Sequence, residues 1–301
     1  MSAELFLAAA DRLTARDFDA FAELLHPDVI TSGLDDWPEP GPFHGRGPAL
    51  GQFERIVADF DAQRVSDFEV VAEGVHWSVV EYRWHVRGAG SQVETHFDLA
   101  VGVRVDEGLL AELHFRRTRT AALATLAGIR PCRGEESRAI LAIVNAAAEA
   151  YRGVIPADRW HEPYMPAEEL DEEIAAGVDF WGYEAGGQLL GVMGIQPVRD
   201  VHLIRHAYVT PRVQRCGIGG ALLDHLLADM DGRVLVGTWT AAQWAVDFYL
   251  RHGFAKLGPE QTAELLREYW SIPERQVATS VVLERKSSTA RDQAARAAGS
   301  R

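Results

Sequence analysis

Apolar residues recur with a helical period at the start of the chain and alternate with polar residues later. A stripe three or four positions apart predicts an opening helix, and it consists of Phe6, Ala9, Ala10 and Leu13. A second helix is expected from Phe18 to His26-Pro27, because proline disfavours a helix before it. A third is expected over 49–61. Alternation then predicts antiparallel strands, over 68–73, 77–87, 92–105 and 109–117.

A different order of elements begins near residue 129. The pattern predicts helices over 136–151 and from Pro166 to Gly177, then strands over 180–184, 188–196 and 201–209. A glycine-rich turn, a helix, a strand over 233–240, a further helix and a last strand over 277–284 follow. We therefore predict an α+β chain of two domains, 1–127 and 128–285, with a disordered polar tail over 286–301.

Composition and charge narrow the functional classes. The chain has 301 residues and a net charge of −14, which disfavours binding to nucleic acid. No apolar run approaches the roughly 20 residues that cross a bilayer, and the N-terminus lacks the basic start of a secretory signal. We expect a cytoplasmic protein without a membrane partner, in which Cys132 and Cys216 are free thiols. We expect no metal site.

Polar residues share one face on several strands of the first domain. They could line a wet cavity as acid and base groups, or form the solvent face of a half-buried sheet. The residues of these faces are Glu81, Arg83 and His85; Glu94, His96 and Asp98; and Glu112, His114 and Arg116.

The stretch 209–223, VTPRVQRCGIGGALL, leads a strand through glycines directly into a helix. This order presents backbone N–H groups and a helix N-terminus to an anion. Gly217 and Gly219 lack a Cβ, so a pyrophosphate can approach the main chain. The spacing differs from the dinucleotide-binding GxGxxG and from the phosphate-binding GK[ST] patterns.

The motif QRCGIG, followed by ALL, resembles the acetyl-CoA motif of the GNAT N-acetyltransferase superfamily. A second signature, AVDFYLRHGF over 245–254, resembles that family's A-x-x-F-Y-x-x-x-G-F ending. The resemblance extends over about 129–285 and implies a mixed α/β sheet and acetyl-CoA as cofactor.

The resemblance also implies roles for single residues. Val209 is expected to pair its backbone with the pantetheine arm. Tyr249 matches the tyrosine that protonates the departing thiolate or hydrogen-bonds the CoA sulfur. Ala242 stands where the family often has an asparagine that contacts CoA. The residues expected to surround the pyrophosphate are Gln214, Arg215, Cys216, Gly217, Ile218, Gly219 and Gly220.

The reaction also needs a base, because an amine is protonated at neutral pH. In this family the base often comes from the strands before the pyrophosphate loop. Alternation places His202, His206 and Tyr208 on one face of strand 201–209 and Arg205 on the other. His206 is our candidate base, the alternative being a histidine satisfied within the sheet. Four aromatic residues suggest an acceptor pocket or core packing: Trp181, Tyr183, Trp239 and Trp244.

The first domain resembles the SnoaL-like, nuclear-transport-factor-2-like superfamily over about 3–127. The resemblance rests on LLHPDV over 24–29, FHGR over 43–46 and DEGLLAEL over 106–113. It implies a cone-shaped α+β domain with a curved antiparallel sheet and a cavity that hosts cyclases, isomerases, hydrolases or silent binders. Relatives often dimerise through the sheet, so a homodimer is possible.

These observations favour an acetyl-CoA-dependent N-acetyltransferase. It would act by direct transfer on a primary amine of a small molecule, with an accessory SnoaL-like domain for ligand binding or dimerisation. One alternative is cyclase or isomerase activity in the N-terminal domain. Another is a CoA-binding sensor without catalysis.

Overall fold

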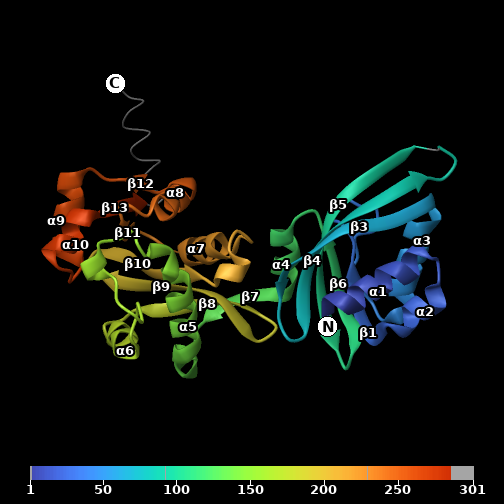
Figure 1. Ribbon diagram of the computed structural model, residues 1–301, viewed down its shortest axis with the longest axis horizontal. Helices are drawn as coiled ribbons and strands as arrows, with labels where there is room; N and C mark the ends of the chain where they lie inside the picture. The colour runs from blue at the N-terminus through green and yellow to red at the C-terminus, as the bar shows by residue number, and fades with distance from the viewer. Residues whose placement is uncertain (1, 92, 229, 286–301) are drawn as a thin grey trace. The chain divides into compact units, whose positions relative to one another are not determined.

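The computed structural model describes residues 2–91, 93–228 and 230–285 (Figure 1). The predicted tail, 286–301, lies outside the described residues. The chain divides into two compact units. The first comprises the residues up to Gly128 together with Glu184–Gln188, and the second comprises the rest.

The first unit packs helices against one mixed sheet. Its strand order is β2-β1-β6-β5-β4-β3. Its elements are α1 (Ser2–Thr14), α2 (Phe18–Glu23), β1 (Leu25–Ser32), β2 (Phe43–His44), α3 (Arg46–Ala58), β3 (Phe60–Glu73), β4 (Trp77–Gly88), β5 (Glu94–Asp106), β6 (Leu109–Arg116) and α4 (Arg119–Leu126).

The sheet of the first unit departs from the prediction in one respect. Strands β3 to β6 pair antiparallel, as expected, but β1 pairs parallel to β6, with Ile30 beside Glu112 and Ser32 beside His114. The sequence predicted a helix as far as His26-Pro27 and no strand over 25–32. This segment forms a strand because its β-branched residues join a partner some 80 residues away, which no local period reveals.

The core of the first unit lies between helices α1 to α3 and one face of the sheet. Phe6, Phe21 and Phe53 project from these helices and pack on buried strand residues such as Tyr82 and Leu113. Helix α4 covers the opposite face, where a Cβ on Gly102 would lie 2.7 Å from the carbonyl oxygen of Ala122. Glycine is therefore required for this helix to lie so close to β5.

The second unit has a seven-stranded sheet in the order β12-β13-β11-β10-β9-β8-β7. Its strands are β7 (Ala127–Pro131), β8 (Asp179–Ala185), β9 (Gln188–Val198), β10 (Val201–Val209), β11 (Arg233–Trp239), β12 (Ala255–Lys256) and β13 (Ser280–Arg285). Its helices are α5 (Ser137–Ala148), α6 (Ala167–Ala175), α7 (Ile218–Ala228), α8 (Gln243–Arg251), α9 (Pro259–Tyr269) and α10 (Glu274–Thr279), with short 3-10 turns between them.

Both parallel and antiparallel pairs occur in this sheet, as predicted for the second domain. Strand β10 is parallel to β11 and antiparallel to β9, and β11 is antiparallel to β13. The last strand was predicted from residue 277, but helix α10 occupies 274–279 and β13 begins at Ser280. Pro273 stands just before α10 and fits the start of a helix.

Candidate active site

Strands β10 and β11 stop pairing halfway along their length. The last paired residues are Ile204 and Val236, although β10 continues to Val209 and β11 to Trp239. At this point His206 has a φ of +47°, and the register of β10 against β9 shifts between Arg205 and Tyr208. The β11 side of residues 206–209 is therefore open to a ligand that can pair with a strand.

The glycine-rich loop follows directly from the open end of β10. Positive φ values at Arg215 (+63°) and Gly217 (+82°) turn the chain into α7. The side-chain amide of Gln214 donates to the carbonyl of Val209, with 3.1 Å between nitrogen and oxygen. The first N–H groups of a helix have no partner within it, so the start of α7 has a geometry that can accept an anion.

The two glycines at the start of α7 differ in whether the surrounding side chains leave space for a Cβ. A Cβ on Gly220 would lie 2.9 Å from Nε2 of His252, so its absence is a packing requirement. A Cβ on Gly219 would make only an ordinary 3.5 Å contact with Phe248. The fold therefore does not require glycine at 219. Cys216 and Ile218 within this loop are buried.

A groove of about 720 Å³ lies in this unit and reaches the gap between β10 and β11. Its lining includes Gly237 and Thr238 of β11 together with His206 and Tyr208 of β10. One part of its wall is aromatic, with Tyr151, Tyr164, Tyr208, Trp239, Tyr269 and Trp270. Another part is acidic and comes from helix α6, with Glu169, Glu172 and Glu173.

Of the four aromatic residues singled out in the sequence, the structure brings two to this region. Trp239 lines the groove, and Trp244 lies 5.6 Å from Tyr151, centroid to centroid. Trp181 lines a separate pocket, and Tyr183 is buried in β8. These two residues therefore do not contribute to an acceptor site in the groove.

His206 faces a carboxylate. Its Nε2 lies 3.3 Å from Oε2 of Glu173, and Arg205 pairs with Oε1 of the same residue. Alternation predicted that Arg205 and His206 point to opposite faces, and this prediction is wrong. The positive φ at His206 interrupts the alternation, so that both side chains reach the same carboxylate.

Glu173 was missed as a functional residue because it was read only as part of the charge at a helix start. Burial alone would raise the pKa of this carboxyl group. The close contacts with His206 and Arg205 overcome that effect and hold its pKa below the ordinary value. Glu173 is therefore ionised at neutral pH beside the candidate base.

Tyr249 lies on α8 and is buried. Its ring packs against Phe248 and Phe254, with centroids 5.0 and 5.4 Å away. Burial, and to a smaller extent Tyr151, raises the pKa of Tyr249 above its ordinary value. The hydroxyl therefore keeps its proton at neutral pH and can donate it to a stronger base.

Other tyrosine hydroxyls near Tyr249 are also held in the neutral form. Burial raises the pKa of Tyr151 to about 12 and the pKa of Tyr208 well above its ordinary value. Tyr164 accepts a long hydrogen bond of 3.5 Å from Nε1 of Trp239. The aromatic wall of the groove thus offers neutral hydroxyl groups and ring faces, while α6 supplies the negative charge.

The polar faces in the first unit do not form an acid–base site. His96 and Asp98 are exposed, and Nε of Arg83 binds Oδ1 of Asp98 at 2.8 Å on the face away from the core. His114 contacts Ser32 and Glu112 instead of entering a cavity. The interpretation as a solvent face holds for the end of the face at His96 and Asp98, whereas Val79 and Ala100 on the same face are buried.

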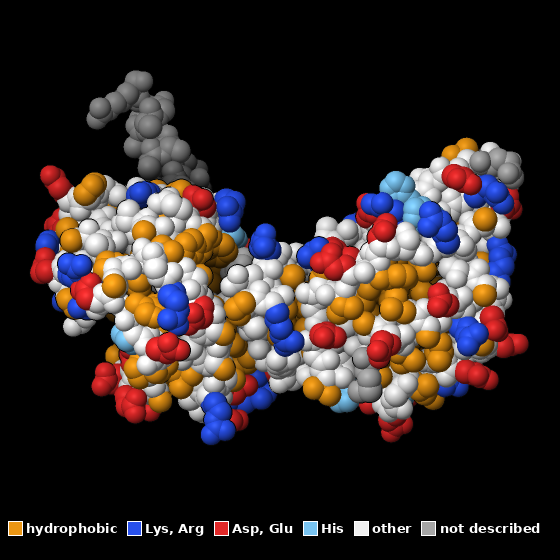
Figure 2. All heavy atoms as spheres, viewed as in Figure 1, with side chains coloured by type: hydrophobic (Ala, Val, Ile, Leu, Met, Phe, Trp, Pro, Cys, Tyr) orange, Lys and Arg blue, Asp and Glu red, His pale blue; other side chains and the backbone are white. Residues whose placement is uncertain are grey.

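Three further observations concern the surface charge, the metal-ligating side chains and the lengths of the helices. Acidic and basic side chains are interspersed on the face drawn in Figure 2. Among the described residues, no group of three or more His, Cys, Asp or Glu side chains is arranged to hold a metal ion. No helix in that part of the chain is both long and apolar enough to cross a membrane.

Comparison with family models finds one match in each half of the chain. Residues 145–268 match the family described as acetyltransferase (GNAT) domain, and residues 6–113 match the SnoaL-like domain. No match was found among curated proteins.

Solved structures resemble one half or the other. An N-acetyltransferase of Thermoplasma acidophilum in complex with coenzyme A is 16% identical, with a TM-score of 0.42, over 54% of this chain and 99% of that one. A protein of Catenulispora acidiphila with a ketosteroid isomerase-like fold, in complex with trimethylamine, is 15% identical, with a TM-score of 0.35, over 41% and 92%. A putative polyketide cyclase of Xanthomonas campestris is 17% identical, with a TM-score of 0.34, over 41% and 94%.

Proposed function

Because the chain carries a GNAT domain over 145–268 and a SnoaL-like domain over 6–113, we propose that it is an acetyl-CoA-dependent N-acetyltransferase. It acts by direct transfer on a primary amine of a small molecule. The observation that carries this proposal is the parting of β10 and β11 after Ile204 and Val236, next to the glycine-rich start of α7.

The residues at this place fit the cofactor. The free side of Val209 and its neighbours on β10 can pair with the amide groups of a pantetheine arm. The loop from Gln214 to Gly220 supplies backbone N–H groups for the pyrophosphate, and Gly219 leaves room that the fold itself does not need. Ala242 is fully buried and offers no amide, so one contact common in the family is missing here.

When bound, acetyl-CoA supplies an acetyl group activated as a thioester. His206 accepts the proton that the incoming amine must lose, and the ionised Glu173 positions the imidazole and stabilises its positive charge. Tyr249 keeps its proton and donates a hydrogen bond to the leaving thiolate, which stabilises the negative charge on sulfur.

The groove favours a cationic acceptor. Among the described residues Glu169 and Glu172 make no ion pair, while Glu173 is paired with Arg205 and His206. Two carboxylates beside aromatic rings attract an ammonium group by charge and by cation–π contact. An anionic acceptor would meet like charge at the same wall.

The test begins with titration of acetyl-CoA into the full chain by calorimetry, followed by a thiol-release assay with primary amines. We expect saturable binding and thiol release that depends on a cationic amine. Binding without release for every amine would favour the CoA-binding sensor. Absence of binding would refute the proposal.

The His206→Gln variant distinguishes catalysis from binding. It should bind acetyl-CoA as the natural chain does and release thiol at least tenfold more slowly.

Three further properties stay predictions: the domain bounds at 127 and 128, a cytoplasmic location and a homodimer.

A further inference from the structure

The groove of the second unit has one end without charge, which we call the apolar end. The segment from α9 to the start of β13 forms it, with Leu266, Tyr269, Trp270, Ile272 and Pro273 among its lining residues. None of the described lining residues beyond 260 is Asp, Glu, His, Lys or Arg. The whole groove has a volume of about 720 Å³, within the range of pockets that hold drug-sized molecules. It therefore has room and apolar surface for more than an ammonium group.

Trp270 lies beside the point where the two central strands part. A Cβ on Gly237 would lie 3.5 Å from the atoms Cε2 and Cζ2 of the indole ring. Gly237 directly follows Val236, the last residue of β11 that pairs with β10. The indole ring is therefore next to the gap that the proposed function gives to the thioester and the amine.

The aromatic side chains of the apolar end are held in place. Trp270 is partly buried and packs against a core cluster that contains Leu266. The hydroxyl of Tyr269 donates to Oδ1 of Asp200, with 2.7 Å between the two oxygens. A wall that is already ordered loses little conformational freedom when a ligand packs on it.

The unpaired negative charge of the groove lies outside the apolar end. Asp158, on a loop next to α10, lines the groove but is neutralised by Arg275, whose Nε lies 2.7 Å from its Oδ2. Glu169 and Glu172 of α6 make no ion pair with any described residue, and both line the groove. The groove thus separates free carboxylates from an apolar surface.

We propose that the acceptor is a primary amine that carries a flat apolar ring on a short linker, and that Trp270 selects it by packing on that ring. The ammonium group lies toward the carboxylates of α6, and the ring lies in the apolar end. Ring–ring contact adds to the gain from burying apolar area. This inference rests on the proposed acetyltransferase function, because it assigns a substrate class to the same groove.

The ring takes no part in the reaction itself. Transfer joins the amine nitrogen to the acetyl carbon and breaks the carbon–sulfur bond. The ammonium group loses two protons, of which one ends on the CoA sulfur and the other in solvent. The apolar end therefore contributes through binding and orientation of the acceptor.

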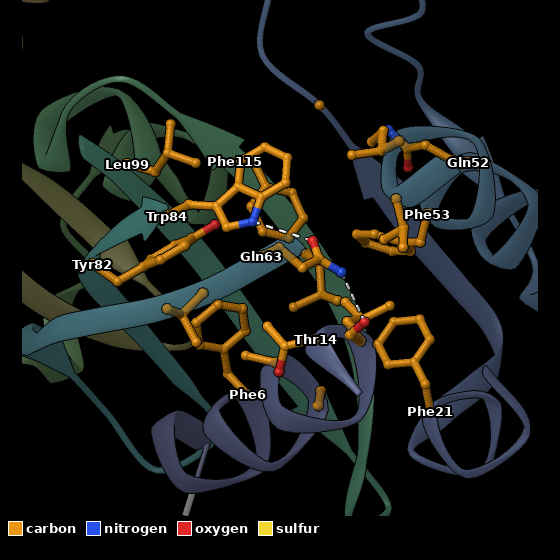
Figure 3. A pocket seen from close by; sticks show the side chains of 18 of the residues that line it. Phe6, Thr14, Phe21, Gln52, Phe53, Gln63, Tyr82, Trp84, Leu99 and Phe115 are labelled. Atoms are coloured by element: carbon orange, nitrogen blue, oxygen red, sulfur yellow. Dashed lines mark hydrogen bonds between the residues drawn. The ribbon is translucent and has the colours of Figure 1, made fainter. Parts of the chain in front are cut away.

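The pocket of the first unit does not compete for such an amine. It lies among aromatic side chains such as Phe6, Phe53 and Trp84 (Figure 3), and its volume is about 90 Å³. A cavity that holds benzene has about 150 Å³. None of the described residues that line the smaller pocket is charged. A ring-bearing ammonium ion finds neither the space nor a counter-charge there.

The test compares three amines in the thiol-release assay on the full chain. 2-Phenylethylamine carries a flat ring, 2-cyclohexylethylamine a puckered ring of similar size, and butylamine no ring. We expect kcat/KM for 2-phenylethylamine to exceed that for butylamine at least tenfold and that for the cyclohexyl compound about threefold. Equal values for the phenyl and butyl compounds would overturn the substrate class. An equal or higher value for the cyclohexyl compound would overturn the selection of a flat ring.

Binding separates a failure of this inference from a failure of the proposed function. Ligand-observed NMR titration measures the affinity of the full chain for the same amines, whether or not thiol is released. If no amine yields thiol but 2-phenylethylamine binds at least tenfold more tightly than butylamine, the transferase is refuted and the ring site stands. Equal affinities without thiol release would overturn both.

Trp270→Leu tests the residue that packs on the ring. Leucine keeps an apolar side chain but removes the indole, so the preference for 2-phenylethylamine over butylamine should fall about tenfold. Trp270→Phe should keep the preference within about threefold. Trp181→Leu is the matched control, because Trp181 lines a separate pocket, and it should leave the preference unchanged. An unchanged preference in Trp270→Leu would remove Trp270 from the site.

Gly237→Ala tests the space beside the indole without removing a side chain. The new methyl group would make ordinary contacts, 3.4 Å from Leu266 and 3.5 Å from Trp270, so folding should be unaffected. It occupies part of the apolar end, so KM for 2-phenylethylamine should rise about tenfold and KM for butylamine less than about threefold. An equal change for both amines would contradict the position of the ring beside Gly237.

Discussion

Glu173 on α6 and His206 on β10 form a carboxylate–imidazole pair, with 3.3 Å between Oε2 and Nε2. The pair exists because His206 has a φ of +47°, which interrupts the alternation of β10. Arg205 contacts the same carboxylate, so one acid on a helix holds two successive residues of the strand. The strand irregularity and the candidate base are thus one structural feature.

Glu173→Gln tests the positioning role. The amide keeps the shape but loses the charge that stabilises a protonated His206, so kcat should fall about tenfold to a hundredfold, in the range of general-base effects. KM for acetyl-CoA should not change, since Glu173 lines the acceptor groove. Steady-state kinetics of thiol release measure both. Glu168→Gln, on the same helix but outside the groove lining, is the control; an equal loss there would indicate a purely structural effect.

Tyr249→Phe tests the proton donor. The leaving thiolate would lose the hydrogen bond that stabilises its charge, so kcat should fall about tenfold to a hundredfold while calorimetric binding of acetyl-CoA stays the same. Tyr183→Phe removes a hydroxyl from an equally buried tyrosine, each 5% exposed, and should leave kcat unchanged. Full activity in Tyr249→Phe would exclude its role as the acid.

Gly219→Ala separates binding from folding. The new methyl group would make an ordinary 3.5 Å contact with Phe248, and alanine favours a helix over glycine by up to about 1 kcal/mol. Stability in denaturant should therefore hold or rise, while the methyl group at the helix start weakens acetyl-CoA binding at least tenfold. Gly47→Ala in α3, where a Cβ meets nothing within 4 Å, should change stability only. Unaltered acetyl-CoA affinity of the 219 variant would place the pyrophosphate elsewhere.

The double variant Glu169→Gln and Glu172→Gln tests acceptor recognition. Each exposed charge pair contributes about 0.2–1 kcal/mol, so KM for a cationic amine should rise about threefold to tenfold with little change in kcat. The difference from the natural chain should shrink at high salt, because charges at a groove wall are screened. A KM for the cationic amine that changes neither with the double substitution nor with the salt concentration would argue against a cationic acceptor.

Glu136 gives a pH-dependent stability prediction. Hydrogen bonds from Arg130, together with the backbone N–H of Arg133, lower the pKa of Glu136 to about 2 despite partial burial. Its folded pKa lies below the ordinary 4.5, so the contribution is full above that pH and is lost as pH falls towards 2. Glu136→Gln should destabilise by about 1 kcal/mol at pH 7. Urea unfolding of the natural chain and of Glu136→Gln at pH 7 and pH 3 measures this effect. If the two proteins differ in free energy of unfolding by the same amount at both pH values, the contribution of the ion pair is refuted.

The sequence predicted the elements whose own residues have a regular period of apolar positions. The alternating runs before Gly88 and Gly108 became β4 and β5, and the stripe with Phe6 became α1. The glycine loop and Tyr249 were found because their spacing is itself the signal. These parts of the fold and the site are encoded within short segments.

Features that depend on distant partners were not predicted. Strand β1 needs β6 beside it, and helix α4, capped by the hydroxyl of Thr118, forms over 119–126, where no element was predicted. The pairing of Glu173 with His206 joins α6 to a bulge whose φ no sequence pattern indicates.

The parting of β10 and β11 also bears on local stability. Only the four residue pairs from Val201–Arg233 to Ile204–Val236 hold these two central strands together. A molecule that pairs with residues 206–209 would supply the missing hydrogen bonds to β10 and extend the short hydrogen-bonded region. Amide hydrogens on both strands should then exchange more slowly when the ligand is bound. The protein is therefore more rigid in the ligand-bound state than in the ligand-free state.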